Sequence, residues 1–165
     1  MVGEIRDMET AGIAVNTALT GHLLLSTLHT NDVSTTLPRL LDMKVEPFLV
    51  ASTVSIGIGQ RLVRKICEHC KEKRTITDDA LRDLGNHVSA STLGDNKEFY
   101  YGAGCDKCAG TGYKGRLVIA EVLVADEEMR EAIVRKCSAS EIKQIAVKNG
   151  MTPMLVDGFQ KALQA

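Results

Sequence analysis

The chain has 165 residues, enough for one domain or one and a half, and its 20 Lys and Arg residues nearly balance 21 Asp and Glu residues, for a formal charge of −1. That balance gives no sign of a basic nucleic-acid-binding surface or an acidic tail. No apolar run approaches the roughly 20 residues that cross a bilayer, and the first residues show no signal-peptide pattern. The five cysteines fit a reducing compartment better than a disulfide framework.

Hydrophobic patterning in the first part of the chain predicts alternating helices and strands. Asp7 can cap the first helix, and Gly21 can end it in a left-handed conformation. The short apolar run that follows predicts a strand covered on both faces, as in a parallel sheet. Pro38 either kinks the next helix or lies in its opening turn. The predicted elements are a helix over residues 8–19, a strand over 22–29, helices over 33–43 and 47–54, and a strand or extended segment over 55–66.

The second part predicts a surface excursion over residues 71–104, then a strand and three helices. The excursion contains a short helix and a polar stretch around residues 94–96. Asp126 caps one later helix, and Ser138 or Ser140 caps the next. Cys137 falls in a helical stretch and is expected to be an ordinary buried residue. The predicted elements are a helix over residues 78–84, a strand over 115–124, and helices over 126–136, 138–148 and 153–163.

Two CxxC pairs are the strongest chemical signal: Cys67-Glu-His-Cys70 and Cys105-Asp-Lys-Cys108. Two such knuckles complete the closed four-thiolate site typical of structural zinc, and glycines follow the second pair where a turn needs positive φ. The 34 residues between the pairs exceed the usual spacing of about 15–20, but a longer loop costs entropy only slowly. Two unrelated thiol pairs or a redox motif are the alternatives, although neither pair opens a helix in a βαβ pattern. We predict one structural Zn²⁺ on the four cysteines.

A carboxylate and an imidazole are predicted to meet at one edge of the sheet. Glu4 lies where a strand runs into a helix, and ligands of open α/β sheets bind at that edge. A carboxylate there can orient a water or hold Mg²⁺ beside a phosphate, although an isolated acid is also explained as a helix cap or a surface charge. His29 and Thr30 close the next strand at the same edge, where both can reach a terminal phosphate.

His22 begins the same predicted strand as His29. At about 3.3 Å per residue, seven residues separate the two by roughly 23 Å, and their odd spacing points them to opposite faces. In a regular strand, His22 and His29 could not both contact the nucleotide, and we expect His29 to be the one that does. His22 is then equally well explained as a hydrogen-bonded histidine where helix and strand join.

These motifs together carry a family resemblance. Residues 1–11 resemble the Walker B segment of the secretion ATPase superfamily, and residues 19–32 resemble its histidine box. The sequence Gln-Arg-Leu-Val-Arg at 60–64, before the first CxxC, and Gly-Tyr-Lys-Gly-Arg at 112–116, after the second, resemble its tetracysteine branch. That branch contains the type II secretion and type IV pilus assembly ATPases. Residues 117–121 depart from the family's Gly-Ile-Tyr-Glu, which we interpret as a repacked strand without functional weight.

The resemblance implies an α/β fold: the C-terminal part of a RecA-like P-loop NTPase domain with a zinc-binding insertion and C-terminal helices. Residues 1–66 would belong to the ATPase core, 67–115 to a tetracysteine zinc-binding subdomain, and 116–165 to a C-terminal strand and helical subdomain. The chain has no G-x-x-x-x-G-K-[ST] P-loop. The nearest match, residues 110–115, follows a metal knuckle and precedes a strand. We therefore expect the C-terminal portion of a longer motor, inactive alone.

By the same resemblance, Glu4 and His29 are catalytic, His22 and Thr30 contact the nucleotide, and ATP and Mg²⁺ serve the full-length parent. The parent would be a cytoplasmic homo-hexamer that docks on a platform protein of the inner membrane and binds no nucleic acid. Secretion, pilus extension and DNA uptake stay open. The alternative function is a zinc-ribbon interaction module without enzymatic activity. It would either resemble the CxxCxGxG repeat of J-domain chaperones, which residues 105–112 match, or bind nucleic acid.

Overall fold

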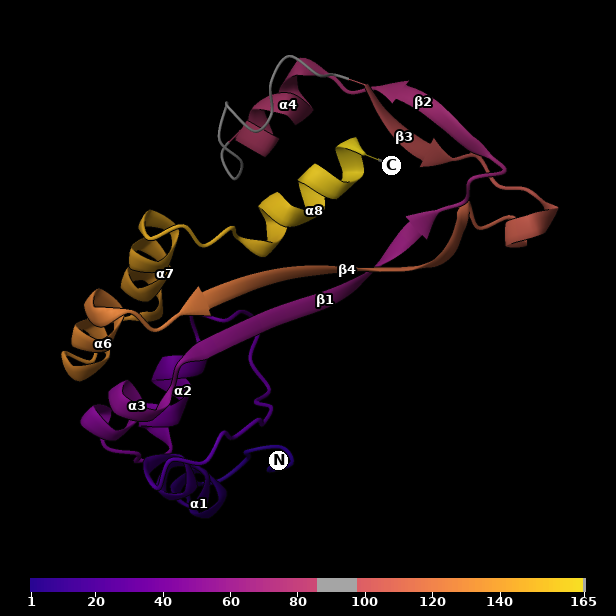
Figure 1. The fold of residues 1–165 in the computed structure, drawn as a ribbon. Helices are drawn as coiled ribbons and strands as arrows, with labels where there is room; N and C mark the ends of the chain where they lie inside the picture. Colours follow the sequence, from indigo (N-terminus) through magenta and orange to yellow (C-terminus); the bar gives the residue numbers. More distant parts are fainter. Residues whose placement is uncertain (86–97, 165) are drawn as a thin grey trace. The chain divides into compact units, whose positions relative to one another are not determined.

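The computed structural model describes residues 1–85 and 98–164, which form two compact units of mixed helix and strand (Figure 1). The first unit comprises Met1–Gly59 and Glu121–Met151, and the second comprises Gln60–Ala120 and Thr152–Ala165. The prediction of a mixed α/β fold is thus confirmed. The functional ranges 1–66, 67–115 and 116–165 stay a prediction, and the polar stretch at 94–96 lies outside the described residues.

Helix α1 of the first unit (Met8–Leu19) begins and ends where the sequence predicts. The Asp7 carboxylate accepts a hydrogen bond from the Thr10 N–H at 2.8 Å, which satisfies one of the free donors of the first turn. Gly21, just beyond the helix, has a φ of 86°, a conformation that favours glycine.

Two short helices follow, α2 (Thr36–Asp42) and α3 (Pro47–Thr53). Because α2 begins three residues later than the predicted helix over 33–43, Pro38 lies in its opening turn and causes no kink. This is one of the two outcomes that the sequence left open.

Helices α6 (Glu127–Val134) and α7 (Ala139–Lys148) complete the first unit. Asp126 and Ser138 are their N-caps, so the predicted caps are confirmed. The prediction for Cys137 was wrong, because this residue lies between the two helices and is only half-buried. It directly follows Lys136, whose φ of 57° interrupts the helical backbone. The most completely buried side chains of this core are Val33, Val50, Leu123, Met129, Ile133 and Ile142.

The strand predicted over residues 22–29 does not form as a regular, covered strand. Within the described chain this segment has one isolated bridge, a parallel pairing of Thr27 with Glu4. Its side chains are not covered on both faces, because Leu23 is 90% and Leu25 61% exposed, and Met1 of the neighbouring segment is fully exposed. A single short pairing cannot bury two faces of a strand, which explains why the apolar run alone was misleading.

Two long strands, β1 (Ile56–Ile66) and β4 (Tyr113–Val124), pair with one another. The Ala125 N–H donates to the Ser55 carbonyl at 2.9 Å, and the Cys67 N–H donates to the Gly112 carbonyl at 3.0 Å. The start of one strand therefore faces the end of the other, as in an antiparallel pair. Both predicted strands are confirmed, and each leads directly to one cysteine knuckle.

The second unit also contains a hairpin that the sequence did not predict. Strands β2 (Lys71–Thr75) and β3 (Glu98–Gly102) pair antiparallel, with Lys73 opposite Tyr100. Every residue of β2 is exposed, so the segment lacks the alternation that reveals a half-buried strand. The short helix α4 (Asp78–Gly85) agrees with its prediction.

Helix α8 (Met154–Leu163) begins after Pro153, as predicted. It packs on β3 through Phe159 and Phe99, whose ring centroids are 5.6 Å apart. The Asp157 carboxylate accepts the Ala120 N–H at 2.8 Å. The helix is thus held within the second unit by an aromatic pair and by a hydrogen bond to the backbone of β4.

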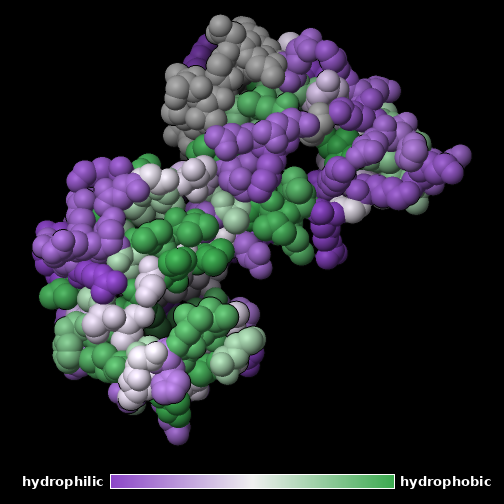
Figure 2. Space-filling model, viewed as in Figure 1, coloured by the Kyte–Doolittle hydropathy of each residue, from purple (hydrophilic) through white to green (hydrophobic). Residues whose placement is uncertain are grey.

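Hydrophobic side chains remain on the surface of the first unit. Met8 and Ile13 of α1 and Phe48 of α3 are each more than half exposed, and Figure 2 shows apolar surface among the polar atoms of this region. Among the described helices, none has the length and apolar character needed to cross a bilayer.

Candidate functional site

A backbone pairing places Glu4 beside the segment that carries His29. Besides the bridge between Glu4 and Thr27, the Ile5 N–H donates to the Thr27 carbonyl at 2.9 Å, and the Val2 N–H donates to the Leu25 carbonyl at 3.1 Å. These bonds bring Glu4 and His29, which are 25 positions apart in the sequence, close together. The proximity was predicted, although the segment of His29 does not form the predicted strand.

Each oxygen of the Glu4 carboxylate contacts a side-chain nitrogen. Its Oε1 lies 2.6 Å from Nε2 of His29, and its Oε2 lies 2.5 Å from a guanidinium nitrogen of Arg6. The Glu4 side chain is 19% exposed, whereas that of His29 is 86% exposed. The three residues belong to a cavity of about 160 Å³. Its lining residues are Glu4, Ile5, Arg6, Leu28, His29, Arg39 and Met43.

The electrostatics of this cavity keep Glu4 ionised. The hydrogen bond from Arg6 is the main cause that lowers the pKa of Glu4. Partial burial opposes it, and the positive charges of Arg6 and His29 reinforce it. In return, Glu4 raises the pKa of Arg6. The site therefore offers a carboxylate that can accept hydrogen bonds or contact a cation at neutral pH.

Oε1 of Glu4 is buried and lies close to His29 but lacks a well-aligned hydrogen bond among the described residues. A buried oxygen without an aligned donor is costly unless something else contacts it. Mg²⁺ commonly binds through one or two carboxylates together with phosphate and water oxygens. In this cavity Glu4 is the carboxylate that could contribute an oxygen to such an ion.

His22 and Thr30 do not line the Glu4 cavity in the described part of the chain. The His22 Nδ1 is 3.0 Å from the Thr20 hydroxyl at the end of α1, the helix–strand contact that the sequence offered as its second explanation. The Thr30 hydroxyl is 3.0 Å from that of Thr36 at the start of α2. Both nucleotide contacts stay predictions.

Two arginines of the cavity were missed by the sequence reasoning. Arg6 lies inside the segment that resembles Walker B, and Arg39 lies in α2. Arg6 is two residues after Glu4, so an extended backbone puts both side chains on one face. That spacing could have identified Arg6. Nothing in the local sequence around Arg39 indicates that it would join them.

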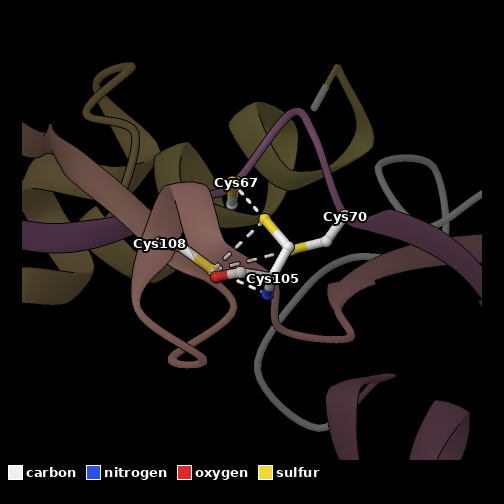
Figure 3. Close-up of side chains that lie close together, drawn as sticks. All are labelled: Cys67, Cys70, Cys105 and Cys108. Atoms are coloured by element: carbon white, nitrogen blue, oxygen red, sulfur yellow. Dashed lines mark hydrogen bonds between the residues drawn. The ribbon is translucent and has the colours of Figure 1, made fainter.

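The four cysteines form a compact sulfur cluster, as predicted. Their sulfur atoms all lie within 4.8 Å of one another, and Figure 3 shows the four side chains converging from the two knuckles. Cys67 lies 4.0 Å from Cys105, and Cys108 lies 3.8 Å from Cys70 and 3.7 Å from Cys105, between sulfur atoms. Four thiolates around zinc, each at about 2.3 Å, would be about 3.8 Å apart. The cluster therefore fits a tetrahedral metal ion.

Backbone N–H groups stabilise a thiolate in the second knuckle. The Cys105 and Gly112 N–H groups donate to the Cys108 sulfur at 3.2 and 3.3 Å. Burial raises the pKa of Cys108, but these two bonds and the neighbouring thiols bring it down to about 6. The pKa of Cys70 is raised to about 12, chiefly by burial and further by the neighbouring thiols. Four sulfurs this close cannot all be ionised without a cation, which is the role of a bound metal.

Close backbone contacts hold the two knuckles together. The Ala103 N–H donates to the Cys70 carbonyl at 2.9 Å, and the Cys67 N–H donates to the Gly112 carbonyl. A Cβ on Gly102 would overlap the carbonyl of Gly112. Gly112 has a φ of 75°, and Gly110 one of 74°, which confirms the prediction of positive φ in this turn. Gly102 was not recognised because β3 itself was not predicted.

Comparison with known proteins assigns the chain to a family. The family model described as "Type II/IV secretion system protein" matches residues 1–165. The type IV pilus assembly ATPase PilB of Thermus thermophilus is 51% identical over 99% of this chain and 18% of its own length. The type II secretion system protein E of Xanthomonas campestris is 43% identical over 99% of this chain and 28% of its own length. The chain thus spans less than a third of either relative.

The solved structure of the Legionella pneumophila ATPase DotB shares the fold. It superposes with a TM-score of 0.59 at 24% identity, over 98% of this chain and 34% of that chain. The match of the whole sequence to one family model, together with relatives above 40% identity, leads to one conclusion: the chain belongs to the type II/IV secretion system protein family.

Proposed function

We propose that the chain is the C-terminal portion of a motor ATPase for type IV pilus assembly or type II secretion. The observation that carries this proposal is the approach of His29 to the carboxylate of Glu4 at 2.6 Å, in a chain whose relatives bear the names of pilus assembly ATPases and type II secretion proteins. A P-loop in a longer parent would hold the β- and γ-phosphates, because this chain contains none.

Within that parent, Glu4 would hold Mg²⁺ or orient the attacking water, and His29 would contact the terminal phosphate. Arg6 favours the first role because it lowers the pKa of Glu4. The high exposure of His29, 86% of its side chain, favours the second because a phosphate could reach the imidazole. Phosphoryl transfer depends almost entirely on such positioning and charge stabilisation. Contacts of His22 and Thr30 with the nucleotide belong to the same proposal.

The four cysteines would bind one structural zinc ion. All four positions of a tetrahedral site are taken by sulfur, so no position remains for a reacting water. The parent would act as a hexamer on the cytoplasmic side of the inner membrane, bound to a platform protein. These last points rest on the resemblance of the motifs.

The test compares ATP hydrolysis by the full-length parent and by this chain. We expect the parent to release phosphate, and Glu4→Gln to lower kcat by about 100-fold or more with little change in nucleotide affinity, because the lost charge acts mainly in the transition state. Glu131→Gln, on the exposed side of α6, is the matched control and should keep full activity. This chain alone should give background release.

Two results would contradict the proposal. One is a parent whose turnover is the same with Glu4→Gln as with Glu131→Gln. The other is robust hydrolysis by the 165-residue chain that Glu4→Gln abolishes. A folded, zinc-bound parent without any turnover would favour the interaction-module alternative.

A further inference from the structure

A buried carboxylate in the first unit lies outside the cavity of Glu4. Glu121, in β4, is 4% exposed and is the only acidic residue buried to this degree in residues 1–85 and 98–164. Its Oε1 accepts a hydrogen bond from the backbone N–H of Val33 at 2.8 Å. A buried charge is costly unless hydrogen bonds satisfy it. Its place in the core therefore calls for an explanation beyond packing.

Strand β1 leaves room for this contact with two glycines. A Cβ on Gly59 would lie 3.1 Å from Cγ and Oε1 of Glu121 and 3.2 Å from the Val33 nitrogen. A Cβ on Gly57 would lie 2.6 Å from a methyl group of Val33. Neither glycine has a positive φ, so backbone conformation does not require them. Glycine is instead required because Glu121 and Val33 occupy the space that a side chain would need.

Val33 ends the short segment that carries His29. Before His29, the backbone is fixed by the bridge of Thr27 to Glu4. After it, the buried bond from Val33 to Glu121 fixes the chain again. The imidazole itself is 86% exposed, so packing does little to hold it. The two anchored ends therefore help to place His29, together with its own contact to Glu4 and the contact between the Thr30 and Thr36 hydroxyls.

We propose that Glu121 is a positioning residue for His29. Its carboxylate fixes the Val33 amide, so that the imidazole four residues earlier stays against Glu4. The expected effect of Glu121 on catalysis rests on the proposed function. Its effect on the position of His29 does not.

The structural part can be tested by NMR on this chain. Glu121→Ala removes the acceptor, and Glu121→Gln keeps an oxygen that can accept the same bond. Gly59→Ala perturbs the contact from the other strand. We expect exchange of the Val33 amide proton to be about tenfold faster or more in Glu121→Ala, because the amide loses its buried acceptor. We also expect the His29 ring signals to shift. Glu121→Gln should stay close to the wild type.

Two matched controls separate position from stability. Glu131→Gln changes an exposed acid of the same unit, and Gly12→Ala adds a methyl group where α1 has open space. Neither should move the His29 signals. If Glu121→Ala does not fold, Gly59→Ala supplies the same readout. Unchanged Val33 exchange and His29 signals in a folded variant would overturn the proposal.

The catalytic part is measured in the full-length parent. Glu121→Ala should lower kcat by about tenfold or more and leave KM nearly unchanged, because small displacements of a catalytic group cost rate more than binding. Glu121→Gln should recover most of the lost rate. Equal kcat in wild type and Glu121→Ala would refute this part. If the parent shows no Glu4-dependent hydrolysis, the proposed function fails, whereas the His29 signals still decide whether Glu121 positions that residue.

Discussion

The cysteine cluster and the Glu4 cavity differ in how much of each site this chain provides. The cluster has four donors of one kind within 4.8 Å, from two turns whose backbones bond to one another, and Cys67 and Cys108 are buried. The cavity has one carboxylate, whose Oε1 lies 2.6 Å from an imidazole that is 86% exposed. A closed metal site needs only short turns, whereas a phosphate site needs donors from several elements. The difference predicts that metal binding survives in this chain and hydrolysis does not.

The largest expected effect comes from removing one ligand of the cluster. Cys67 is 1% exposed and lies within 4.0 Å of Cys105 between sulfur atoms. Cys67→Ser should lower the metal content well below one zinc per chain, because it removes a buried thiolate ligand from a closed four-sulfur site whose metal binding is coupled to folding. Elemental analysis measures the metal, and amide exchange of β2 and β3 measures the folding of the hairpin.

Cys137→Ser is the matched control because Cys137 lies outside the cluster. It should keep full zinc content. The amides of α1, in the first unit, should exchange at similar rates in both variants. A metal-free wild-type chain with a fully protected hairpin would show that zinc is not structural.

The next prediction concerns the two histidines in the full-length parent. His29→Ala should lower kcat by about 100-fold, the usual range for a positioned acid, base or charge-stabilising group, with nucleotide affinity nearly retained. His22 contacts Thr20 at the end of α1. His22→Ala should therefore change stability or contacts between elements more than turnover.

Steady-state kinetics and thermal unfolding of both variants distinguish these effects. Equal turnover defects at unchanged stability would mean that both histidines approach a nucleotide, in one subunit or across two neighbouring subunits of the parent. In that case both histidines would belong to the nucleotide site, and the prediction that only His29 does would be wrong.

A smaller effect is expected where two backbones cross beside the cluster. Gly102→Ala would place a methyl group on the Gly112 carbonyl, which already accepts the Cys67 N–H. The turn must move, and the N–H of Gly112 then no longer aligns with the Cys108 sulfur. Zinc affinity should fall by about 10- to 100-fold, as for other groups that orient metal ligands. Competition with a chromogenic chelator measures it.

Gly12→Ala is the control for this glycine prediction. It lies in α1 with open space around the added methyl group. It should leave zinc affinity unchanged and stabilise the first unit by about 0.5–1 kcal/mol, the usual gain for alanine over glycine in a helix. Equal zinc affinity in Gly102→Ala and the wild type would show that the turn tolerates the added atom.

Local chemistry made the cluster and the helix ends predictable. Asp7, Asp126 and Ser138 cap helices because their side chains reach backbone donors within three residues. The CxxC spacing likewise defines a knuckle without help from the rest of the fold. Such signals need only a few neighbouring residues, so the sequence contains all of the information.

Features that depend on distant partners could not be predicted. The apolar run at 22–29 suggested a covered strand, but its partner in this chain is one short segment. Strand β2 has only exposed residues, so nothing marked it before its pairing with β3 was known. The contact of Glu121 with Val33 joins residues 88 positions apart. In each case the tertiary structure supplies the reason, and the local sequence does not.

The smallest expected effect separates stability of the first unit from geometry of its cavity. Ser138 and Glu141 form a reciprocal cap at the start of α7: the Ser138 N–H donates to Oε2 of Glu141 at 2.8 Å, and the Glu141 N–H donates to the Ser138 hydroxyl at 3.3 Å. The backbone bond from Ser138 is the main cause that lowers the pKa of Glu141. Ser138→Ala should cost about 1 kcal/mol of unfolding free energy at neutral pH.

The contribution of Glu141 to stability should depend on pH in one direction. Its pKa is lower in the folded chain than in the unfolded chain, so its stabilisation is complete above the unfolded pKa and is lost as the pH falls through the folded pKa. Urea unfolding at several pH values should show wild type and Glu141→Gln diverging at neutral pH and converging in acid. At neutral pH the His29 ring signals should be the same in wild type and Glu141→Gln. A shift of those signals in Glu141→Gln would mean that the Glu4 cavity depends on the stability of the whole unit. The His29 signals could then no longer distinguish a positioning role of Glu121 from a general loss of stability.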